Sequence, residues 1–157
     1  GMNWDAIGAV GEILGASGVI VSLFYLASQI RTQNRERRLA AMHEISNAFR
    51  EAYTRFNDGE IADIFARGNS DFDSLTVTEK VRLFSTVNPL IKVLEEAFWQ
   101  HEHGRLDDEI WLPLEKQFSF FLGADTFARV WAQRQALYSE KFQDFVNDME
   151  KHQYEIQ

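Results

Sequence analysis

Hydrophobic positions follow two different patterns along this chain. The first pattern is a run of eighteen residues without a charged side chain, from Ile13 to Ile30, which reads ILGASGVIVSLFYLASQI. A helix of that length spans about 27 Å, close to the hydrocarbon thickness of about 30 Å in a bilayer. A surface helix of a globular protein keeps its hydrophobic residues on one stripe, whereas this run is apolar all round. We therefore expect lipid or other protein to cover it on every side.

The second pattern is amphipathic and belongs to helices of a globular core. No glycine or proline occurs between Val19 and Asn57, so one helix is predicted to run from the apolar segment into the polar one. Its second half carries hydrophobic residues at spacings of three and four, which is typical of a buried helix face. These residues are Met42, Ile45, Phe49, Ala52 and Phe56.

Local signals place the remaining helices. Asn57-Asp58-Gly59 predicts a stop, with Gly59 in a left-handed cap, and a short helix follows at residues 60–67, ended by Gly68-Asn69. Thr76 and Glu79 have capping-box spacing and open a long helix towards Gly104, in which Asn88-Pro89 predicts a kink rather than a break. The buried face of that helix is predicted at Val81, Phe84, Val87, Ile91, Leu94 and Phe98.

Three further helices are predicted after Gly104. Asp107, Asp108 and Glu109 place negative charge at the start of the first, which Gly123 ends. The second covers residues 124–136, and Ser139 caps the last. The sequence thus predicts an all-α fold of about six helices, in which a long N-terminal apolar helix continues into a compact helical bundle. We divide the chain into an apolar anchor or oligomerisation helix at residues 2–30 and an acidic helical domain at residues 31–157.

Small residues form a stripe along the apolar helix. Spacings of three and four separate its members, which places them on one helix face: Gly8, Gly11, Gly15, Gly18 and Ser22. Four glycines inside a helix cost about 3 to 4 kcal/mol relative to alanine, so the stripe needs a reason. Small residues four apart allow two membrane helices to approach closely. We expect a homodimer that crosses at this stripe, and the alternative is that the stripe packs on a helix of the same chain.

Charge is distributed unevenly, although the net charge is −8. Residues 1–38 carry four arginines and three acidic side chains, a net charge of +1, which leaves −9 for residues 39–157. The acidic part repels phosphate backbones, which argues against nucleic acid as a partner. The basic cluster follows the apolar segment directly and is formed by Arg31, Arg35, Arg37 and Arg38. Beside a bilayer these side chains would bind lipid headgroups, and otherwise they form a solvated helix face.

The position of this cluster predicts a location and an orientation. A signal peptide carries its positive charges before a shorter apolar core, whereas here they follow it. Because positive charge collects on the cytoplasmic side, we expect a single-pass anchor in a bacterial inner membrane, with the N-terminus outside and the helical domain in the cytoplasm. A cytoplasmic protein is the alternative.

The N-terminal run also resembles a known group. It contains Glu12-Ile13-Leu14-Gly15, then residues 19–31, VIVSLFYLASQIR, and then Gln33-Asn34. Further matching positions are Ser74-Leu75, Glu79, Phe98, Gln100, Gly104, Leu106, Asp107, Trp111, Trp131 and residues 142–146. In these positions the chain resembles a widespread group of small bacterial proteins without an established activity. The resemblance implies an N-terminal membrane helix and no mechanism.

No motif for a reaction or a cofactor emerges. The richest polar cluster lies at His101 to Glu109, but His101 and His103 are two residues apart and point to different sides of a helix. Glu95 and His103 share a face and are too few to hold a metal, so we read the region as a solvated helix end with a possible Glu-His pair. No Glu-x-x-His, nucleophile elbow, G-x-G-x-x-G or P-loop motif occurs, and the chain has no cysteine. We therefore predict no catalytic, cofactor or metal residues.

The aromatic residues of the bundle allow two interpretations. Large side chains are needed to fill a core among six short helices, and an apolar ligand pocket would also be rich in aromatics. We favour the core for Trp99, Trp111, Phe118, Phe121, Phe127, Trp131, Phe142 and Phe145.

Three functional hypotheses follow from these patterns. The first is a membrane-tethered helical module that binds protein partners or assembles with itself. The second is a soluble helical homo-oligomer with the apolar helix as its seam. The third is a small-molecule binder or enzyme that uses the region from His101 to Glu109.

Overall fold

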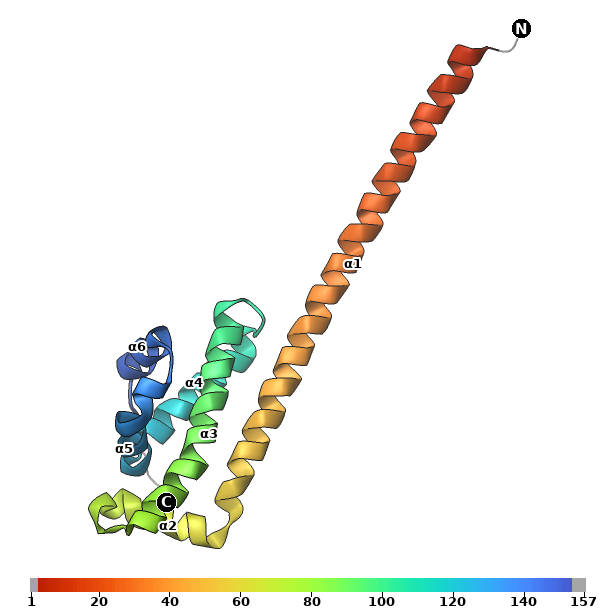
Figure 1. Ribbon diagram of the computed structural model, residues 1–157. Helices are drawn as coiled ribbons and strands as arrows, with labels where there is room; N and C mark the ends of the chain where they lie inside the picture. The colour runs from red at the N-terminus through yellow and green to blue at the C-terminus, as the bar shows by residue number, and fades with distance from the viewer. Residues whose placement is uncertain (1–2, 154–157) are drawn as a thin grey trace. The chain divides into compact units, whose positions relative to one another are not determined.

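The computed structural model describes residues 3–153, and every regular element in that range is a helix (Figure 1). Six α-helices occur: α1 (Trp4–Thr54), α2 (Gly59–Ser70), α3 (Val77–Glu102), α4 (Asp108–Gly123), α5 (Asp125–Arg134) and α6 (Glu140–Asp148). Three short 3₁₀ helices connect them: η1 (Arg55–Asn57), η2 (Phe72–Ser74) and η3 (Gln135–Leu137). The predicted all-α fold with a long N-terminal helix is confirmed.

The chain divides into two units, residues 1–39 and residues 40–157. The first unit contains only the N-terminal part of α1, and the second contains the end of α1 with α2 to α6. The division that we drew at residues 30 and 31 separates apolar from polar sequence rather than packed from unpacked chain, and it stays a prediction.

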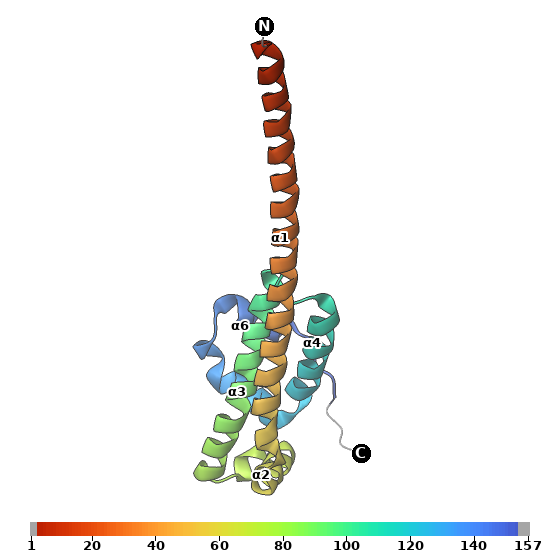
Figure 2. The ribbon, with the colours of Figure 1, turned by 90° about the vertical axis from the view of Figure 1, so that its right-hand side faces the viewer.

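The core of the second unit forms around α3. Leu83, Val87, Leu90 and Leu94 of this helix are buried, and α2, α4 and α5 pack on it (Figure 2). Ile45 and Ala52 of α1 are buried in the same core, with Phe49 packed beside them, so the predicted stripe of that helix is confirmed. At the other end, Phe98 stacks on Phe145 of α6, with 4.9 Å between the ring centroids.

Buried polar groups tie distant elements together. The Trp131 Nε1–H donates to Asn147 Oδ1 at 2.9 Å, and the Tyr138 hydroxyl donates to Asn88 Oδ1 at 2.6 Å. Thr126 is fully buried, and its hydroxyl donates to the Phe65 carbonyl at 3.3 Å. These bonds satisfy donors that would otherwise cost free energy in the core, so they help to specify one arrangement of α2, α3, α5 and α6.

Most predicted helix starts are confirmed. Thr76 and Glu79 form a capping box at the start of α3. Asp107 and Ser139 occupy the N-cap positions of α4 and α6, but neither side chain forms a capping hydrogen bond, and the Ser139 hydroxyl donates to Glu95 instead. Helix α3 continues through Asn88-Pro89, so no break occurs there.

Three local predictions are wrong. Gly59 is not a left-handed cap: Asp58 accepts hydrogen bonds from the backbone N–H groups of Glu60 and Ile61, which makes Gly59 the first residue of α2. Gly68-Asn69 does not end that helix, because the turn of α2 at Gly68 packs against Thr126 and Leu75. Val81 is 58% exposed and does not belong to the buried face of α3.

Candidate functional site

The apolar segment of α1 is the most unusual surface in the described part of the chain. An eighteen-residue window of this helix has a mean hydropathy of 1.9, and none of it is buried. The large hydrophobic side chains from Trp4 to Ile30 are between 52% and 74% exposed. Monomeric soluble proteins rarely expose apolar surface of this extent. Helix α1 is thus long and apolar enough to cross a membrane, a test that core helices and signal sequences also pass.

Hydroxyl groups within this segment form hydrogen bonds inside the helix. The Ser22 hydroxyl donates to the Gly18 carbonyl at 2.8 Å, and the Ser28 hydroxyl donates to the Tyr25 carbonyl at 2.9 Å. In hydrocarbon there is no water to satisfy a polar group, so such internal bonds lower the cost of burial in lipid. The two serines are therefore compatible with an apolar environment on all sides.

Tyr25, Gln29 and Thr32 mark the end of the apolar segment. Gln29 Nε2 donates to the Tyr25 hydroxyl oxygen at 3.0 Å, and the Thr32 hydroxyl donates to the Ser28 carbonyl at 3.1 Å. The pair of Tyr25 and Gln29 is not among the predicted features, although residues four apart share a helix face. This polar end lies next to the basic cluster in the sequence.

The glycine stripe leaves open space along the helix. A Cβ atom added at Gly8, Gly11, Gly15 or Gly18 would meet no other atom within 4 Å, and Ser22 is exposed on the same face. The homodimer stays a prediction.

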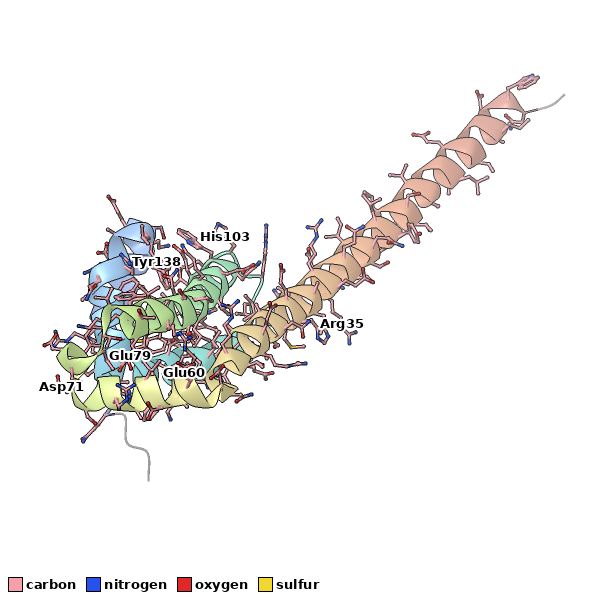
Figure 3. The ribbon with its side chains drawn as sticks, turned by 60° about the horizontal axis from the view of Figure 1, so that its bottom comes forward. Arg35, Glu60, Asp71, Glu79, His103 and Tyr138 are labelled. Carbon is pink, nitrogen blue, oxygen red and sulfur yellow. The ribbon has the colours of Figure 1, made fainter. Side chains whose placement is uncertain are left out.

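The basic cluster is exposed as well. Arg31, Arg35, Arg37 and Arg38 lie on the two turns of α1 that follow Ile30, and Figure 3 shows Arg35 projecting from the helix. Guanidinium groups at this level match the position of anionic headgroups. Headgroup binding by the four arginines stays a prediction.

The region from His101 to Glu109 forms a helix connection rather than a cluster of converging ligands. His101 Nε2 lies 2.8 Å from Asp108 Oδ1, and the imidazole stacks on Trp111 at 4.9 Å between ring centroids. His103 turns back to its own helix, where its Nδ1 lies 2.7 Å from the Trp99 carbonyl oxygen. The imidazole-carboxylate pair is thus His101 with Asp108, and it joins the end of α3 to the start of α4.

Glu95 has a structural task. Its carboxylate accepts hydrogen bonds from Lys92 at 2.8 Å and from the backbone N–H and hydroxyl of Ser139 at 3.0 and 3.2 Å. Burial raises the pKa of Glu95, but the hydrogen bonds from Lys92 and Ser139 outweigh burial, so the pKa lies below its ordinary value. Burial of the Tyr138 hydroxyl raises its pKa, and the negative charge of Glu95 raises that pKa further. Glu95 therefore accepts the hydrogen bonds of Ser139 at the start of α6 and does not pair with His103.

No metal centre can be assembled from these groups. Within residues 3–153, no set of three or more His, Cys, Asp or Glu side chains is placed to hold a metal ion.

Most of the predicted aromatic core is confirmed. Trp111, Phe118, Phe127, Trp131 and Phe142 are buried in one cluster, and Trp99, Phe121 and Phe145 pack against it. Phe121 and Phe127 also line a small cavity.

Comparison with known proteins adds nothing to this account: no protein-family model, no curated protein and no solved structure matches the chain.

Proposed function

We propose that this chain is a membrane-tethered helical module that assembles with itself and presents its acidic helical domain to partners in the cytoplasm. One observation carries the proposal: a segment of bilayer length in α1 is apolar on every side and none of it is buried. Covering that surface with lipid removes the cost of exposing it to water.

The charge order supports an orientation. Four arginines follow the apolar segment, whereas the charged side chains within residues 1–12 are the acidic Asp5 and Glu12. The positive-inside rule then places residues 31–157 in the cytoplasm. Each arginine near an anionic leaflet contributes about 1 kcal/mol of attraction, which adds to the anchoring by the helix itself.

The small-residue stripe supports self-association within the membrane. Lipid tails are as apolar as leucine, so membrane helices associate through close packing rather than through a hydrophobic driving force. The open surface at Gly11, Gly15 and Gly18 would let two backbones approach closely. The Ser22 hydroxyl is already bonded within its own helix, so it needs no partner across the interface.

Cell fractionation tests the anchor. We expect the untagged protein to pellet with membranes, to resist washing with high salt and alkaline carbonate, and to dissolve in detergent. Recovery in the cytosol without detergent would contradict the proposal and favour the soluble oligomer with α1 as its seam.

A charged variant of the apolar segment tests whether this segment is the anchor. Val21 and Leu23 are 67% and 61% exposed, so Val21→Lys with Leu23→Lys removes no packing within the chain. In a membrane each lysine costs about 2.5–3.5 kcal/mol at the helix centre. The double variant is expected to leave the membrane fraction while the circular dichroism of its helical domain is retained. Unchanged membrane retention would show that α1 does not lie in lipid.

A further inference from the structure

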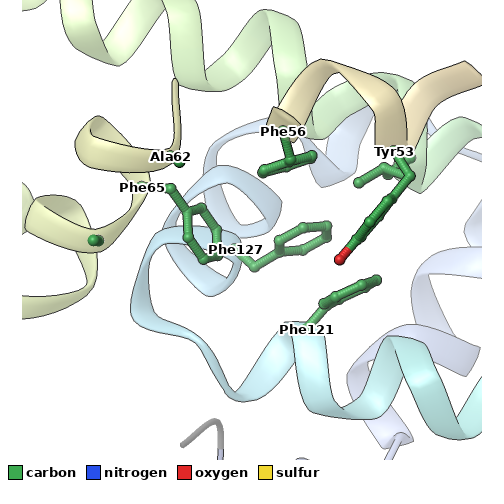
Figure 4. Close-up of a pocket in the computed structure, with 8 residues that line it drawn as sticks. Tyr53, Phe56, Ala62, Phe65, Phe121 and Phe127 are labelled. Carbon is green, nitrogen blue, oxygen red and sulfur yellow. The ribbon is translucent and has the colours of Figure 1, made fainter. Parts of the chain in front are cut away.

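A small cavity lies within residues 40–157, where five helices and a 3₁₀ turn converge (Figure 4). Its volume is about 180 Å³. The lining comes from α1, η1, α2, α3, α4 and α5, and consists of Tyr53, Phe56, Ala62, Phe65, Ala66, Leu90, Phe121 and Phe127.

Aromatic rings form most of the wall. Phe121 stacks on Phe127 with 5.3 Å between centroids, and Tyr53 stacks on Phe121 at 6.4 Å. Phe56 meets Phe65 edge to face at 5.5 Å. Rings at these separations offer both faces and edges to a further ring, the two contacts that aromatic pairs prefer.

The cavity has a buried floor and an accessible rim. Leu90 and Phe127 are buried completely or almost so, whereas Tyr53, Ala62 and Ala66 are exposed. Ala62 and Ala66 lie one turn apart on α2 and contribute only a methyl group each, which is why the space between α2 and the aromatic wall stays unfilled. The exposed lining residues therefore lie on α1 and α2, and the buried ones face the core.

We propose that this cavity binds a small uncharged aromatic molecule of one ring. An apolar protein cavity of about 150 Å³ stays dry and takes up benzene, so the volume fits one ring and falls short of the ~300 Å³ at which drug-sized pockets begin. None of the eight lining residues is charged, and the Tyr53 hydroxyl is the only polar side-chain group among them. An ionised ligand would lose its hydration there without gaining a counter-charge. The assignment is independent of the membrane anchor.

Methyl NMR of the full-length chain in lipid nanodiscs tests the cavity directly. The lining supplies three reporters, the methyl groups of Ala62, Ala66 and Leu90, and exposed Ala132 of α5 serves as an internal reference. Toluene is the probe, with its free concentration measured in the aqueous phase. We expect saturable shifts of the three cavity methyls, a dissociation constant below about 1 mM and no shift at Ala132.

Charged probes define the ligand class. Benzoate has the same ring with a negative charge, and tetramethylammonium tests whether the rings act as a cage for a cation. Neither is expected to shift the cavity methyls. Binding of either probe as tightly as toluene would overturn the proposal, as would the absence of saturable toluene shifts or equal shifts at Ala132. Contacts of lipid acyl chains with Ala62 and Ala66 that toluene does not displace would overturn it too.

Two filling variants link the shifts to this cavity. Ala66→Phe and Ala62→Leu place side chains into the space, and each is expected to weaken toluene binding by ~10-fold or more. Ala132→Phe, the matched control on α5, is expected to bind as the parent does. If Ala66→Phe fails to fold, toluene binding by the variant with the smaller side chain, Ala62→Leu, tests the proposal. Undiminished binding by a folded filling variant would show that the ligand sits elsewhere.

Discussion

At the scale of single residues, Gly68 is a position where helix packing leaves no room for a side chain. A Cβ atom built there would lie 2.9 Å from Thr126 Oγ1 and 3.0 Å from Leu75 Cδ1. Thr126 cannot move freely, because its hydroxyl donates to the Phe65 carbonyl and its backbone N–H donates to Asn69 Oδ1. The contact between α2 and α5 therefore depends on the absence of a side chain at Gly68.

We expect Gly68→Ala to lower the free energy of unfolding by about 1–3 kcal/mol, because the added methyl overpacks this contact. Gly59→Ala is the matched control: Gly59 also lies in α2, and a Cβ there meets nothing within 4 Å. That variant is expected to be neutral or stabilising by up to about 1 kcal/mol, since alanine favours the helix. Urea unfolding followed by tryptophan fluorescence compares the two. Equal effects would mean that α2 and α5 are not packed closely at Gly68.

Glu79 links a helix cap to an ion pair at the residue scale. Its carboxylate accepts from Arg67 at 2.5 Å and from the backbone N–H and hydroxyl of Thr76 at 2.8 and 2.9 Å. A second ion pair joins the same two helices, between Glu60 of α2 and Arg82 of α3. Figure 3 labels Glu60 and Glu79. The hydrogen bond from Arg67, followed by those from Thr76, lowers the pKa of Glu79 from 4.5 to about 2.

The depressed pKa of Glu79 predicts a pH dependence of stability. Because the folded state favours the carboxylate, the stabilisation is complete above the unfolded pKa of about 4.5 and is lost as the pH falls towards about 2. Glu79→Gln removes the titrating group, so we expect it to be less stable than the parent near neutral pH and to lose less stability between about pH 5 and pH 2. Urea midpoints across that range measure the difference. Parallel curves for the two proteins would contradict the assignment.

At the scale of elements, local side-chain chemistry made helix starts predictable from sequence. The capping box of Thr76 and Glu79 and the acidic start at Asp107 act over three or four residues, so their outcome is visible in the local sequence. The predictions at Gly59 and Gly68 are wrong because a glycine does not always end a helix: a Cβ atom at Gly59 would meet nothing within 4 Å, whereas a Cβ atom at Gly68 would overlap its neighbours. Asp58 caps α2, so Gly59 is the first residue of that helix. Gly68 lies inside α2, where it packs against Thr126.

The apolar half of α1 gives the prediction for self-association. Gly15→Leu would separate two helices that cross at the stripe by several Å, so we expect weaker association in sedimentation equilibrium in detergent. Ala16→Leu is the matched control, because residue 16 lies about 100° from residue 15 around the helix and off the stripe. The same assembly for Gly15→Leu as for the parent would exclude the stripe as the interface. An equal loss in both variants would point to a general effect of size.

At the scale of the whole molecule, the sequence predicted the fold class but not the cavity. The apolar run of α1 and the 3.6-residue periodicity of the other helices are patterns within short stretches of sequence, so they predict an all-α chain. The cavity brings Tyr53 and Phe56 to Phe121 and Phe127, which lie more than sixty positions away in the chain. Its empty space depends on how α2 packs beside these rings, and no local signal specifies that. Of the eight lining residues, the sequence indicates three as core residues, Phe56, Phe121 and Phe127, and it does not indicate that they surround a cavity.

Membrane insertion is a property of the whole molecule, and the absence of cysteine allows a clean test of it. Asn3→Cys places one thiol before the apolar segment, and Glu140→Cys places one on the exposed start of α6 in a second protein. Both positions are exposed, so neither substitution removes buried packing.

Labelling of these two variants with a membrane-impermeant maleimide in intact spheroplasts tests the central claim most directly. The account predicts that the cysteine at position 3 reacts before lysis, and that the cysteine at position 140 reacts only after lysis. Protection of both cysteines until lysis would contradict the account, because it would place the whole chain inside the cell, and labelling of position 140 in intact spheroplasts would contradict the orientation.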